Sequence, residues 1–324
     1  MSRQHPFIGM FMNMAEGDRE ISARREAFLQ GVGTLQGLTV ASRFGAGEFD
    51  SYGAKAQALR DLVVDGAGPD LYFATCWPSL RAVLGVVQDK PVVFAGVVDL
   101  SPNPAGNPEY APNVSGFISY GTNLCGEWPR LLRAVAPAVS RAAVLYDMNP
   151  NRPHGLSVYN EIAARAQNLI PPLQVTRGID CGSETLDADL ARFVNEAGTP
   201  PGLIVAVSVV AAKKRQTIID RADALRLPVV YPNRLYTFHE GTITHGGLIS
   251  KGTYIQGLYR SAGEYVRQVI QQIVAGQPLP PRKIEITQTG PNAKFETVIN
   301  LKAANAIGLN VDPAVLMNAD LIIE

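Results

Sequence analysis

The chain has 324 residues, of which 46% are hydrophobic and 18% charged, with 29 basic and 29 acidic side chains. This length and composition are typical of a globular protein with one large or two medium domains. A net charge of zero without clustered Lys and Arg argues against a nucleic-acid partner, because such a partner requires positive charge to displace its counterions.

The chain also lacks sequence signals for a membrane, a disulfide framework or a metal. No apolar run approaches the ~20 residues that a membrane-spanning helix needs, so we expect no membrane insertion. The first residues, MSRQHPFIGMFMN, do not resemble a signal peptide, so the protein is cytoplasmic or a leader is missing from this chain. Cys76, Cys125 and Cys181 lie far apart, and we expect buried thiols rather than metal ligands or disulfide partners.

In the first part of the chain, short apolar runs rich in β-formers alternate with helical patterns, which indicates a parallel sheet. In the first helix, Ile21, Phe28 and Val32 fall on one face. The predicted strands are residues 6–12, 38–44, 71–74, 91–98 and 114–118, and the predicted helices are residues 18–35, 51–64 and 78–88.

The same succession then restarts. The predicted helices are residues 124–135, 154–169, 185–196 and 211–225, and the predicted strands are residues 141–146, 173–177, 203–207 and 228–231. A long helix over 253–275 and a Pro-rich segment over 276–282 follow. The last predicted elements are a strand over 295–301, a helix over 302–307 and a strand-like run over 319–323. The repeated succession predicts an α/β protein with two doubly wound, Rossmann-like lobes.

Motifs that would indicate an enzyme are absent. The nearest approach to a dinucleotide fingerprint, at Gly45 and Gly47, lacks its third glycine and follows the second strand, so we interpret it as a loop. There is no Walker sequence, nucleophile elbow or HExxH. His239 and His245 lie six residues apart in a Gly/Thr-rich segment that is typical of a surface loop. We therefore expect a protein that is not an enzyme and has neither cofactor nor metal.

The positions directly after the predicted strands are more informative. In open α/β sheets, ligands bind beyond the carboxyl ends of the strands. Hydrogen-bonding and aromatic side chains are frequent there, which is the mixture expected of a small-molecule site. The candidate ligand-binding residues are Asn13, Glu16, Thr75, Trp77, Ser79, Val98, Asp99, Asn149, Ser208, Tyr231 and Arg234.

Several of these residues have a second explanation that the sequence leaves open. Thr75 and Ser79 flank the start of a helix, where capping would account for either hydroxyl. Trp77 would fit equally as an aromatic residue of the core. Asp99 and Asn149 stand where a turn is expected and would favour it. Taken together, the positions favour a ligand-binding cleft over any one of these explanations.

At the level of motifs, the chain resembles a bacterial family of ABC-transporter substrate-binding proteins related to tryptophan- and tyrosine-binding members. The resemblance extends over nearly the whole chain, and its strongest part is the ending KFETVINLKAANAIGLNVDPAVLMNADLIIE. Further similar segments are PVVFAGVVDLSPNPAG, NVSGF, RAAVLYDMNP, LPVVYPNR and HGGLISKG. Trp77 and Lys251 depart from the family's usual residues, and the segment 236–245 carries a few extra ones, which argues against a tryptophan-type ligand.

The resemblance implies a type I periplasmic-binding fold, with two lobes joined by three crossovers that close on a ligand by hinge motion. The first lobe would comprise residues 1–118 with 249–277, and the second 119–248 with 278–324. The loop 75–79 and the turn at Val98 and Asp99 would hold the ligand from the first lobe. Asn149, Ser208 and the loop 231–234 would hold it from the second.

These observations predict a monomeric, extracytoplasmic solute-binding protein that delivers a small organic solute to an ABC permease. Trp77 and Tyr231 would form apolar walls, Arg234 would pair with a carboxylate, and Asp99 would accept a hydrogen bond from an ammonium or hydroxyl group. One alternative is a cytoplasmic small-molecule sensor on the same fold. A second is an α/β enzyme that uses the same cleft.

Overall fold

The computed structural model describes residues 5–100, 106, 110–120, 122–151, 154–196, 198, 200–237, 246–286 and 295–324. The chain divides into two compact units: Met1–Gly121 with Tyr254–Ala293, and Thr122–Thr253 with Lys294–Glu324. It therefore passes from one unit to the other three times, which agrees with the number of crossovers expected from the resemblance.

The boundaries of the units differ from the predicted ones at two places. Strand β10 (Ile249–Thr253) was assigned to the first lobe, but it pairs with β9 and β12 in the sheet of the second unit. Strand β11 (Ile284–Ile286) was assigned to the second lobe, but it pairs with β5 in the sheet of the first unit. Both segments are short, and hydrogen bonding to strands distant in sequence decides their membership.

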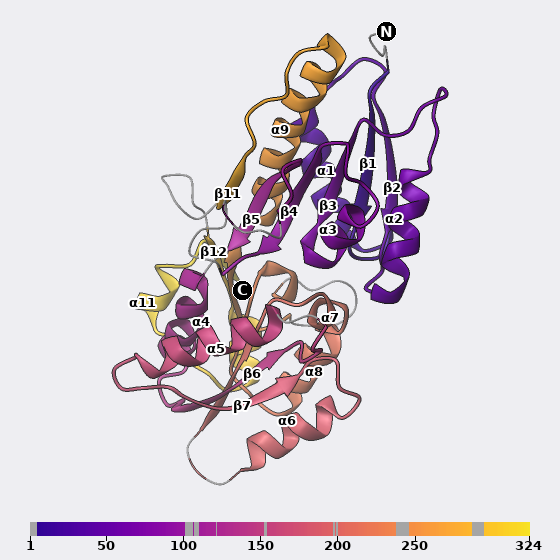
Figure 1. The fold of residues 1–324 in the computed structure, drawn as a ribbon. Coiled ribbons are helices and arrows are strands. Elements are labelled where there is room, and N and C mark those ends of the chain that lie inside the picture. Colours follow the sequence, from indigo (N-terminus) through magenta and orange to yellow (C-terminus); the bar gives the residue numbers. More distant parts are fainter. Residues whose placement is uncertain are drawn as a thin grey trace. The chain divides into compact units, whose positions relative to one another are not determined.

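The first unit is built on a six-stranded sheet with the order β11-β5-β4-β3-β1-β2. All of its pairings are parallel, so the carboxyl ends of its strands share one edge (Figure 1). In addition to β11, the strands are β1 (Phe7–Met12), β2 (Thr39–Phe44), β3 (Leu71–Thr75), β4 (Val92–Val98) and β5 (Val114–Tyr120).

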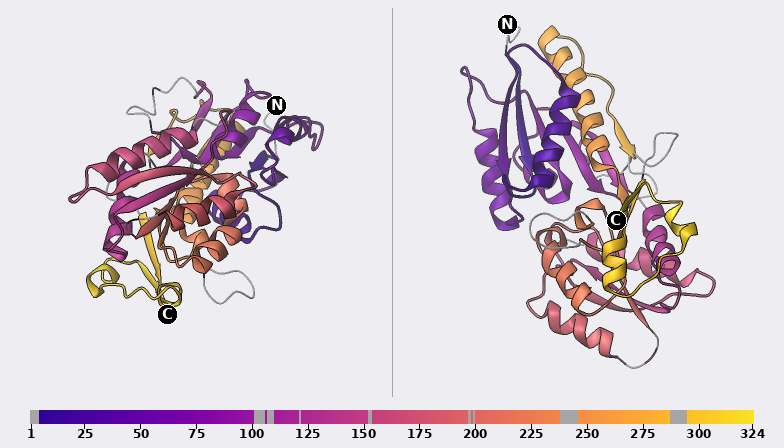
Figure 2. Two further views of the ribbon diagram at one scale, coloured as in Figure 1. Left: turned by 90° about the horizontal axis from the view of Figure 1, so that it is seen from below. Right: turned by 180° about the vertical axis from the view of Figure 1, so that it is seen from behind.

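Helices cover both faces of this sheet. Helices α1 (Arg19–Val32) and α9 (Ile255–Ala275) lie side by side on one face, visible as the indigo and orange helices in Figure 2. Helices α2 (Tyr52–Arg60) and α3 (Cys76–Leu84) cover the other face, with the short η1 (Phe49–Ser51) before α2. Burial of apolar side chains on both faces explains why the sequences of the inner strands β1, β3 and β4 are nearly continuous apolar runs.

The second unit has a seven-stranded sheet with the order β13-β12-β10-β9-β8-β6-β7. Its pairings are parallel except for β10 with β12, which run antiparallel. In addition to β10, the strands are β6 (Arg141–Tyr146), β7 (Gln174–Asp180), β8 (Pro201–Val205), β9 (Val229–Tyr231), β12 (Phe295–Asn300) and β13 (Leu321–Ile323). The two parallel-dominated sheets with flanking helices confirm the predicted α/β class.

The helices of the second unit also flank its sheet on both faces. The apolar sides of α6, α7 and α8 pack against one face of strands β6 to β9 in one hydrophobic core. Helices α4 and α5 contact each other and the sheet. The predicted helix over 211–225 is two helices, because the backbone leaves the α-region at Lys214. The helices are α4 (Thr122–Val135), α5 (His154–Gln167), α6 (Leu186–Asn195), α7 (Val209–Lys213), α8 (Arg215–Ala224), η3 (Arg234–Tyr236), α10 (Leu301–Ala306) and α11 (Pro313–Leu316).

A buried arginine closes the end of α6. The Arg141 guanidinium, at the start of β6, donates to the carbonyl oxygens of Phe193 at 2.9 Å and Glu196 at 3.0 Å. Its carbon Cζ lies 4.6 Å from the centre of the Phe193 ring. These contacts satisfy carbonyl groups that a helix leaves without partners at its last turn, so the charge of Arg141 is buried with partners.

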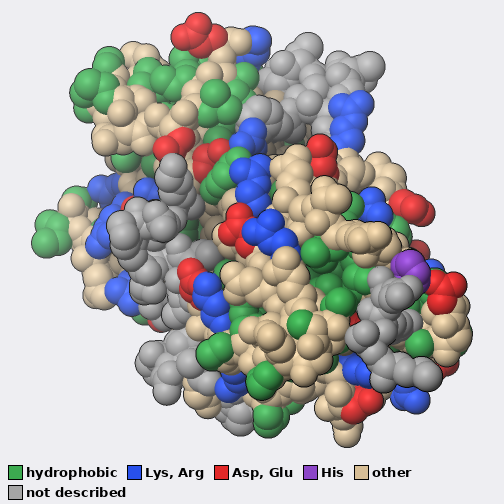
Figure 3. All heavy atoms as spheres, turned by 90° about the horizontal axis from the view of Figure 1, so that it is seen from above, with side chains coloured by type: hydrophobic (Ala, Val, Ile, Leu, Met, Phe, Trp, Pro, Cys, Tyr) green, Lys and Arg blue, Asp and Glu red, His purple; other side chains and the backbone are tan. Residues whose placement is uncertain are grey.

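Neither charge dominates the face of the molecule drawn in Figure 3. On the face drawn in Figure 3, basic and acidic side chains are interspersed, as the equal numbers in the sequence lead one to expect. Within the described ranges, no helix is both long enough and apolar enough to cross a membrane.

Candidate ligand-binding residues

Two of the predicted residues are joined at the carboxyl edge of the first sheet. Asn13 follows β1 and Thr75 ends β3, and these strands are neighbours. The Asn13 backbone N–H donates to Thr75 Oγ1 at 2.9 Å, and the Thr75 hydroxyl donates to Asn13 Oδ1 at 2.9 Å. Both side chains are buried, and the Asn13 carbonyl accepts from the Tyr52 hydroxyl at 2.6 Å. These two strand ends therefore meet within this unit.

The Asn13–Thr75 pair continues into a network that the sequence did not predict. Tyr259, near the start of α9, lies close to Thr75 and to Arg24 of α1, because both residues act on its pKa. The Arg24 Nε atom lies 2.9 Å from Glu20 Oε1. Burial raises the pKa of Tyr259 to about 12, although the charge of Arg24 opposes this shift. Tyr259 is therefore a neutral hydrogen-bonding group at physiological pH.

Arg24 keeps its charge within this network. Burial disfavours the cation, but the charge and hydrogen bond of Glu20, with a contribution from Tyr259, raise the pKa of Arg24 above its ordinary value. Its guanidinium carbon lies 5.8 Å from the centre of the Tyr259 ring, within the range of a cation–π contact. Arg24 falls between the apolar positions of α1, and no sequence signal shows that it would face α9.

Trp77 belongs to a different arrangement at the same edge. Its indole N–H donates to the Val98 carbonyl at 2.7 Å, and its ring stacks on Tyr110 with centroids 5.1 Å apart. Tyr110 also stacks on Phe94 at 5.1 Å and donates from its hydroxyl to Asp99 Oδ2 at 3.0 Å. Trp77 is 6% exposed, so the residue expected to form a wall is packed into a stack of three aromatic rings. The same stack positions the buried carboxylate of Asp99.

The remaining predicted residues of the first unit have different environments. Ser79 is fully buried in α3, with its oxygen 3.8 Å from the sulfur of Cys76. Glu16 is exposed in the turn between β1 and α1.

Cys76, which was not among the predicted site residues, has a backbone φ of +57°, a conformation that L-amino acids rarely adopt. Such residues concentrate at functional sites because the surrounding structure must hold them there.

In the second unit, two predicted residues organise loops at the carboxyl edge of the sheet. The Asn149 backbone N–H donates to Asp147 Oδ1 at 3.1 Å, and the Asn149 side chain accepts from the Asn151 N–H at 2.9 Å. Ser208 caps α7 by accepting from the N–H of Val210 at 3.0 Å and of Ala211 at 3.3 Å. Turn formation and capping therefore occupy these side chains.

Tyr231 and Arg234 are engaged within the second unit. Tyr231 is 1% exposed, stacks on Tyr236 with centroids 5.0 Å apart and belongs to the core beneath α6, α7 and α8. Burial raises its pKa well above the ordinary value. The guanidinium of Arg234 forms an ion pair with Glu296 at 2.8 Å, with both side chains largely covered. A carboxylate ligand would therefore compete with Glu296 for this arginine.

All three cysteines are free thiols; Cys125 and Cys181 are buried, as predicted, whereas Cys76 is partly exposed. Burial raises the pKa of Cys76 to about 11 and the pKa values of Cys125 and Cys181 to about 12. We expect a thiol reagent at pH 8 to modify native Cys76 about 100-fold more slowly than an ordinary thiol, because the thiolate is the reacting form. Reaction kinetics with and without denaturant measure this. Rapid labelling of the native protein at the rate of a free thiol would contradict it.

The part of the chain that the structure describes contains no group of three or more His, Cys, Asp or Glu arranged to hold a metal. His239 and His245 lie outside the described residues.

Comparisons with solved structures identify proteins that share this fold. No family model matches the chain, and no curated protein matches it. Among solved structures, an ABC domain in complex with L-Trp from Streptococcus pneumoniae aligns with a TM-score of 0.77 and 17% identity, covering 98% of this chain and 100% of that one. A ligand-free, open substrate-binding protein with adhesive properties from Clostridium difficile aligns with a TM-score of 0.63 and 18% identity, covering 98% and 99%.

A third neighbour has a different role. A LacI transcriptional regulator from Lactobacillus brevis aligns with a TM-score of 0.54 and 11% identity, covering 86% of this chain and 98% of the regulator. Identities this low establish architecture and leave function to be argued from the residues. The chain has the fold of the substrate-binding proteins of ABC transporters, the type I periplasmic-binding fold.

Proposed function

We propose that the chain is the solute-binding protein of an ABC importer and binds a small organic solute that is amino-acid-like or carries an aromatic ring or a carboxylate. The observation that carries this proposal is the alignment of nearly the whole chain with an ABC domain solved in complex with L-Trp and with a substrate-binding protein. In this role the protein works without catalysis, outside the cytoplasm, and delivers its solute to the transmembrane permease.

The residues of the first unit support a polar solute. Asp99 is 5% exposed, and its carboxylate is held in place by the Tyr110 hydroxyl at 3.0 Å. A carboxylate whose position is fixed by packing loses little conformational entropy when it binds an ammonium or hydroxyl group. Asp99 is therefore our first candidate for contact with the solute, with Asn13 and Thr75 beside it in the sheet order. In the second unit, Asn149 and Ser208 stay candidates at the corresponding edge.

A thermal-shift screen over amino acids and aromatic carboxylic acids tests the proposal. A solute that binds only the folded protein, present at 100 times its Kd, should add about 2.7 kcal/mol to the free energy of unfolding. A panel without a stabilising member would contradict the proposal.

The variant D99N then tests the contact. For an amine-bearing solute we expect at least a tenfold loss of affinity, because a charged hydrogen bond contributes about 1.5–3 kcal/mol. The deaminated analogue of the same solute should bind D99N and the native protein alike. D61N, at an exposed carboxylate beyond the end of α2, is the matched control. Equal loss for both solutes would show that Asp99 acts through the structure alone.

A sensor is the second candidate, because a LacI regulator shares the fold. Uptake of the labelled solute by cells that lack the protein separates the two functions. Loss of uptake supports the importer, whereas normal uptake with altered transcript levels supports the sensor.

A further inference from the structure

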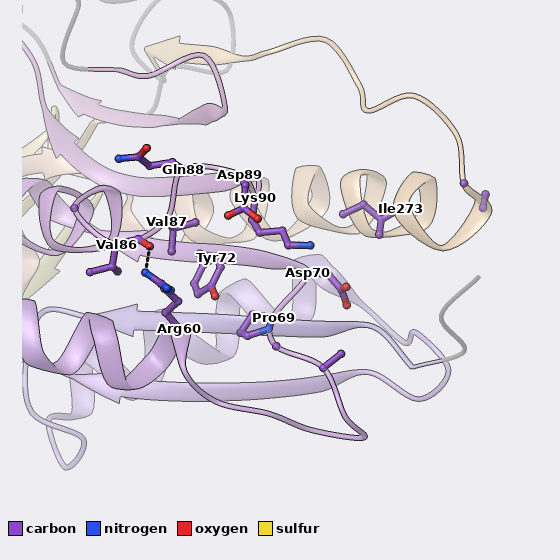
Figure 4. Close-up of a pocket in the computed structure, with 15 residues that line it drawn as sticks. Arg60, Pro69, Asp70, Tyr72, Val86, Val87, Gln88, Asp89, Lys90 and Ile273 are labelled. Atoms are coloured by element: carbon purple, nitrogen blue, oxygen red, sulfur yellow. Dashed lines mark hydrogen bonds between the residues drawn. The ribbon is translucent and has the colours of Figure 1, made fainter. Parts of the chain in front are cut away.

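A cavity of about 980 Å³ lies at the amino edge of the first sheet, the edge opposite to Asn13 and Thr75 (Figure 4). It is bounded by the loop 67–70 before β3, the segment 85–90 between α3 and β4, and the end of α9. Its volume falls within the range of small-molecule sites, roughly 300–1,000 Å³. None of the residues that line it belongs to the site proposed above.

The floor of this cavity contains a buried tyrosine whose hydroxyl has no protein partner. Tyr72 is 3% exposed, and its ring belongs to the core cluster beneath α2 and α3. Within the described residues, the Tyr72 hydroxyl makes no hydrogen bond. Burial raises the pKa of Tyr72, the charge of Asp89 adds to the shift, and the charge of Arg60 opposes it. Both charged groups are therefore near enough to act on the phenol.

The rim carries polar side chains that are also unengaged. Figure 4 shows Gln88, Asp89 and Lys90 on one side of the Tyr72 ring, with Pro69 on the other side. All three rim side chains are exposed, and none forms an ion pair or side-chain hydrogen bond with another described residue. By contrast, Arg60 is held in place by donating to the Val86 carbonyl at 3.1 Å. Asp70, a second carboxylate in the lining, accepts from the Phe7 N–H at 2.9 Å. The cavity thus offers a ligand the exposed carboxylate of Asp89, the ammonium group of Lys90 and the phenol of Tyr72.

We propose that this cavity is a second small-molecule site, which binds a zwitterion with the two charges of an α-amino acid. Lys90 receives the carboxylate, Asp89 receives the ammonium group, and the Tyr72 hydroxyl supplies a hydrogen bond between them. Pro69 and Ile273 line the cavity and offer apolar contact to a side chain. A ligand of one charge only would leave either Asp89 or Lys90 without a partner, so the pair selects a molecule that carries both charges. The proposal is independent of the solute site at the carboxyl edge.

Selective labelling of the eleven tyrosines with ¹³C gives a direct test on the whole chain. The Tyr72 signal is assigned by its loss in Y72F and followed during titration with L-leucine. We expect a saturable shift with L-leucine, and binding at least about tenfold weaker for isopentylamine, which lacks the carboxylate, and 4-methylpentanoic acid, which lacks the ammonium group. D89N and K90Q should each weaken the binding of L-leucine by a similar factor.

Matched variants far from the cavity in sequence control for general charge effects. E184Q and K302Q change exposed side chains of the second unit and should leave the titration unchanged. A Tyr72 signal that does not respond to L-leucine up to its solubility limit would overturn the proposal. Equal responses to the zwitterion and to its two singly charged analogues, or unchanged binding in D89N and K90Q, would overturn it as well.

Discussion

Replacement of Gly31 or Gly263 by alanine should each lower the free energy of unfolding by about 3 kcal/mol, the upper end of the usual penalty for overpacking. These glycines lie where α1 and α9 contact each other. A Cβ atom on Gly31 would lie 2.1 Å from the carbonyl oxygen of Arg260, and one on Gly263 would lie 2.1 Å from that of Phe28. Backbone atoms cannot rotate away as side chains can, so the two helices would have to separate. Denaturant unfolding of each variant measures the effect.

Gly53 provides a matched control in the same unit. It lies in α2, and a Cβ atom there would have no neighbour within 4 Å. G53A should therefore stabilise the protein by about 0.5–1 kcal/mol, because alanine favours the helix and restricts the unfolded chain. If G31A and G263A raise the free energy of unfolding as G53A does, the packing of α1 against α9 does not require glycine at positions 31 and 263.

The sequence predicted the fold where a pattern is local. The alternation of strands and helices indicated two doubly wound lobes, and each of the four predicted strands before residue 100 overlaps an observed one. The sequence did not predict the elements that depend on contacts between distant segments of the chain. Strand β11 has three residues and is defined by its pairing with β5, more than 150 positions earlier. The break between α7 and α8 at Lys214 has no glycine or proline to mark it.

The same distinction applies to the candidate site. The rule that ligands bind at the carboxyl ends of parallel strands selected both Asn13 and Thr75, and these residues lie together because β1 and β3 are parallel neighbours. The rule gave no information on side-chain partners. Tyr110, which stacks on Trp77 and positions Asp99, lies in a connection rather than at a strand end. Tyr259 and Arg24 are 235 positions apart in the sequence. The packing of α1 on α9 brings them together near the strand ends.

We expect the Thr75 hydroxyl to contribute more to stability and to solute affinity than any other single group at the carboxyl edge of the first sheet. Its oxygen accepts from the Asn13 N–H at 2.9 Å, and its O–H donates to Asn13 Oδ1 at 2.9 Å. T75V keeps the shape of the side chain and removes these bonds. We expect the free energy of unfolding to fall by about 3 kcal/mol, because buried groups that lose a partner cost roughly 1–3 kcal/mol each. Denaturant unfolding and titration with the solute from the thermal-shift screen measure stability and affinity separately.

T75S is the conservative counterpart, since it retains the oxygen and loses one methyl group. A buried methyl contributes about 1 kcal/mol, so T75S should be destabilised by that amount and should keep its affinity for the solute. T75V should lose affinity as well, because the Asn13 side chain would no longer be held in place at the strand ends. Equal stability and equal affinity in the two variants would mean that the methyl group, rather than the hydroxyl, gives Thr75 its importance. The Asn13–Thr75 hydrogen bonds would then be a consequence of packing without a role in positioning the site.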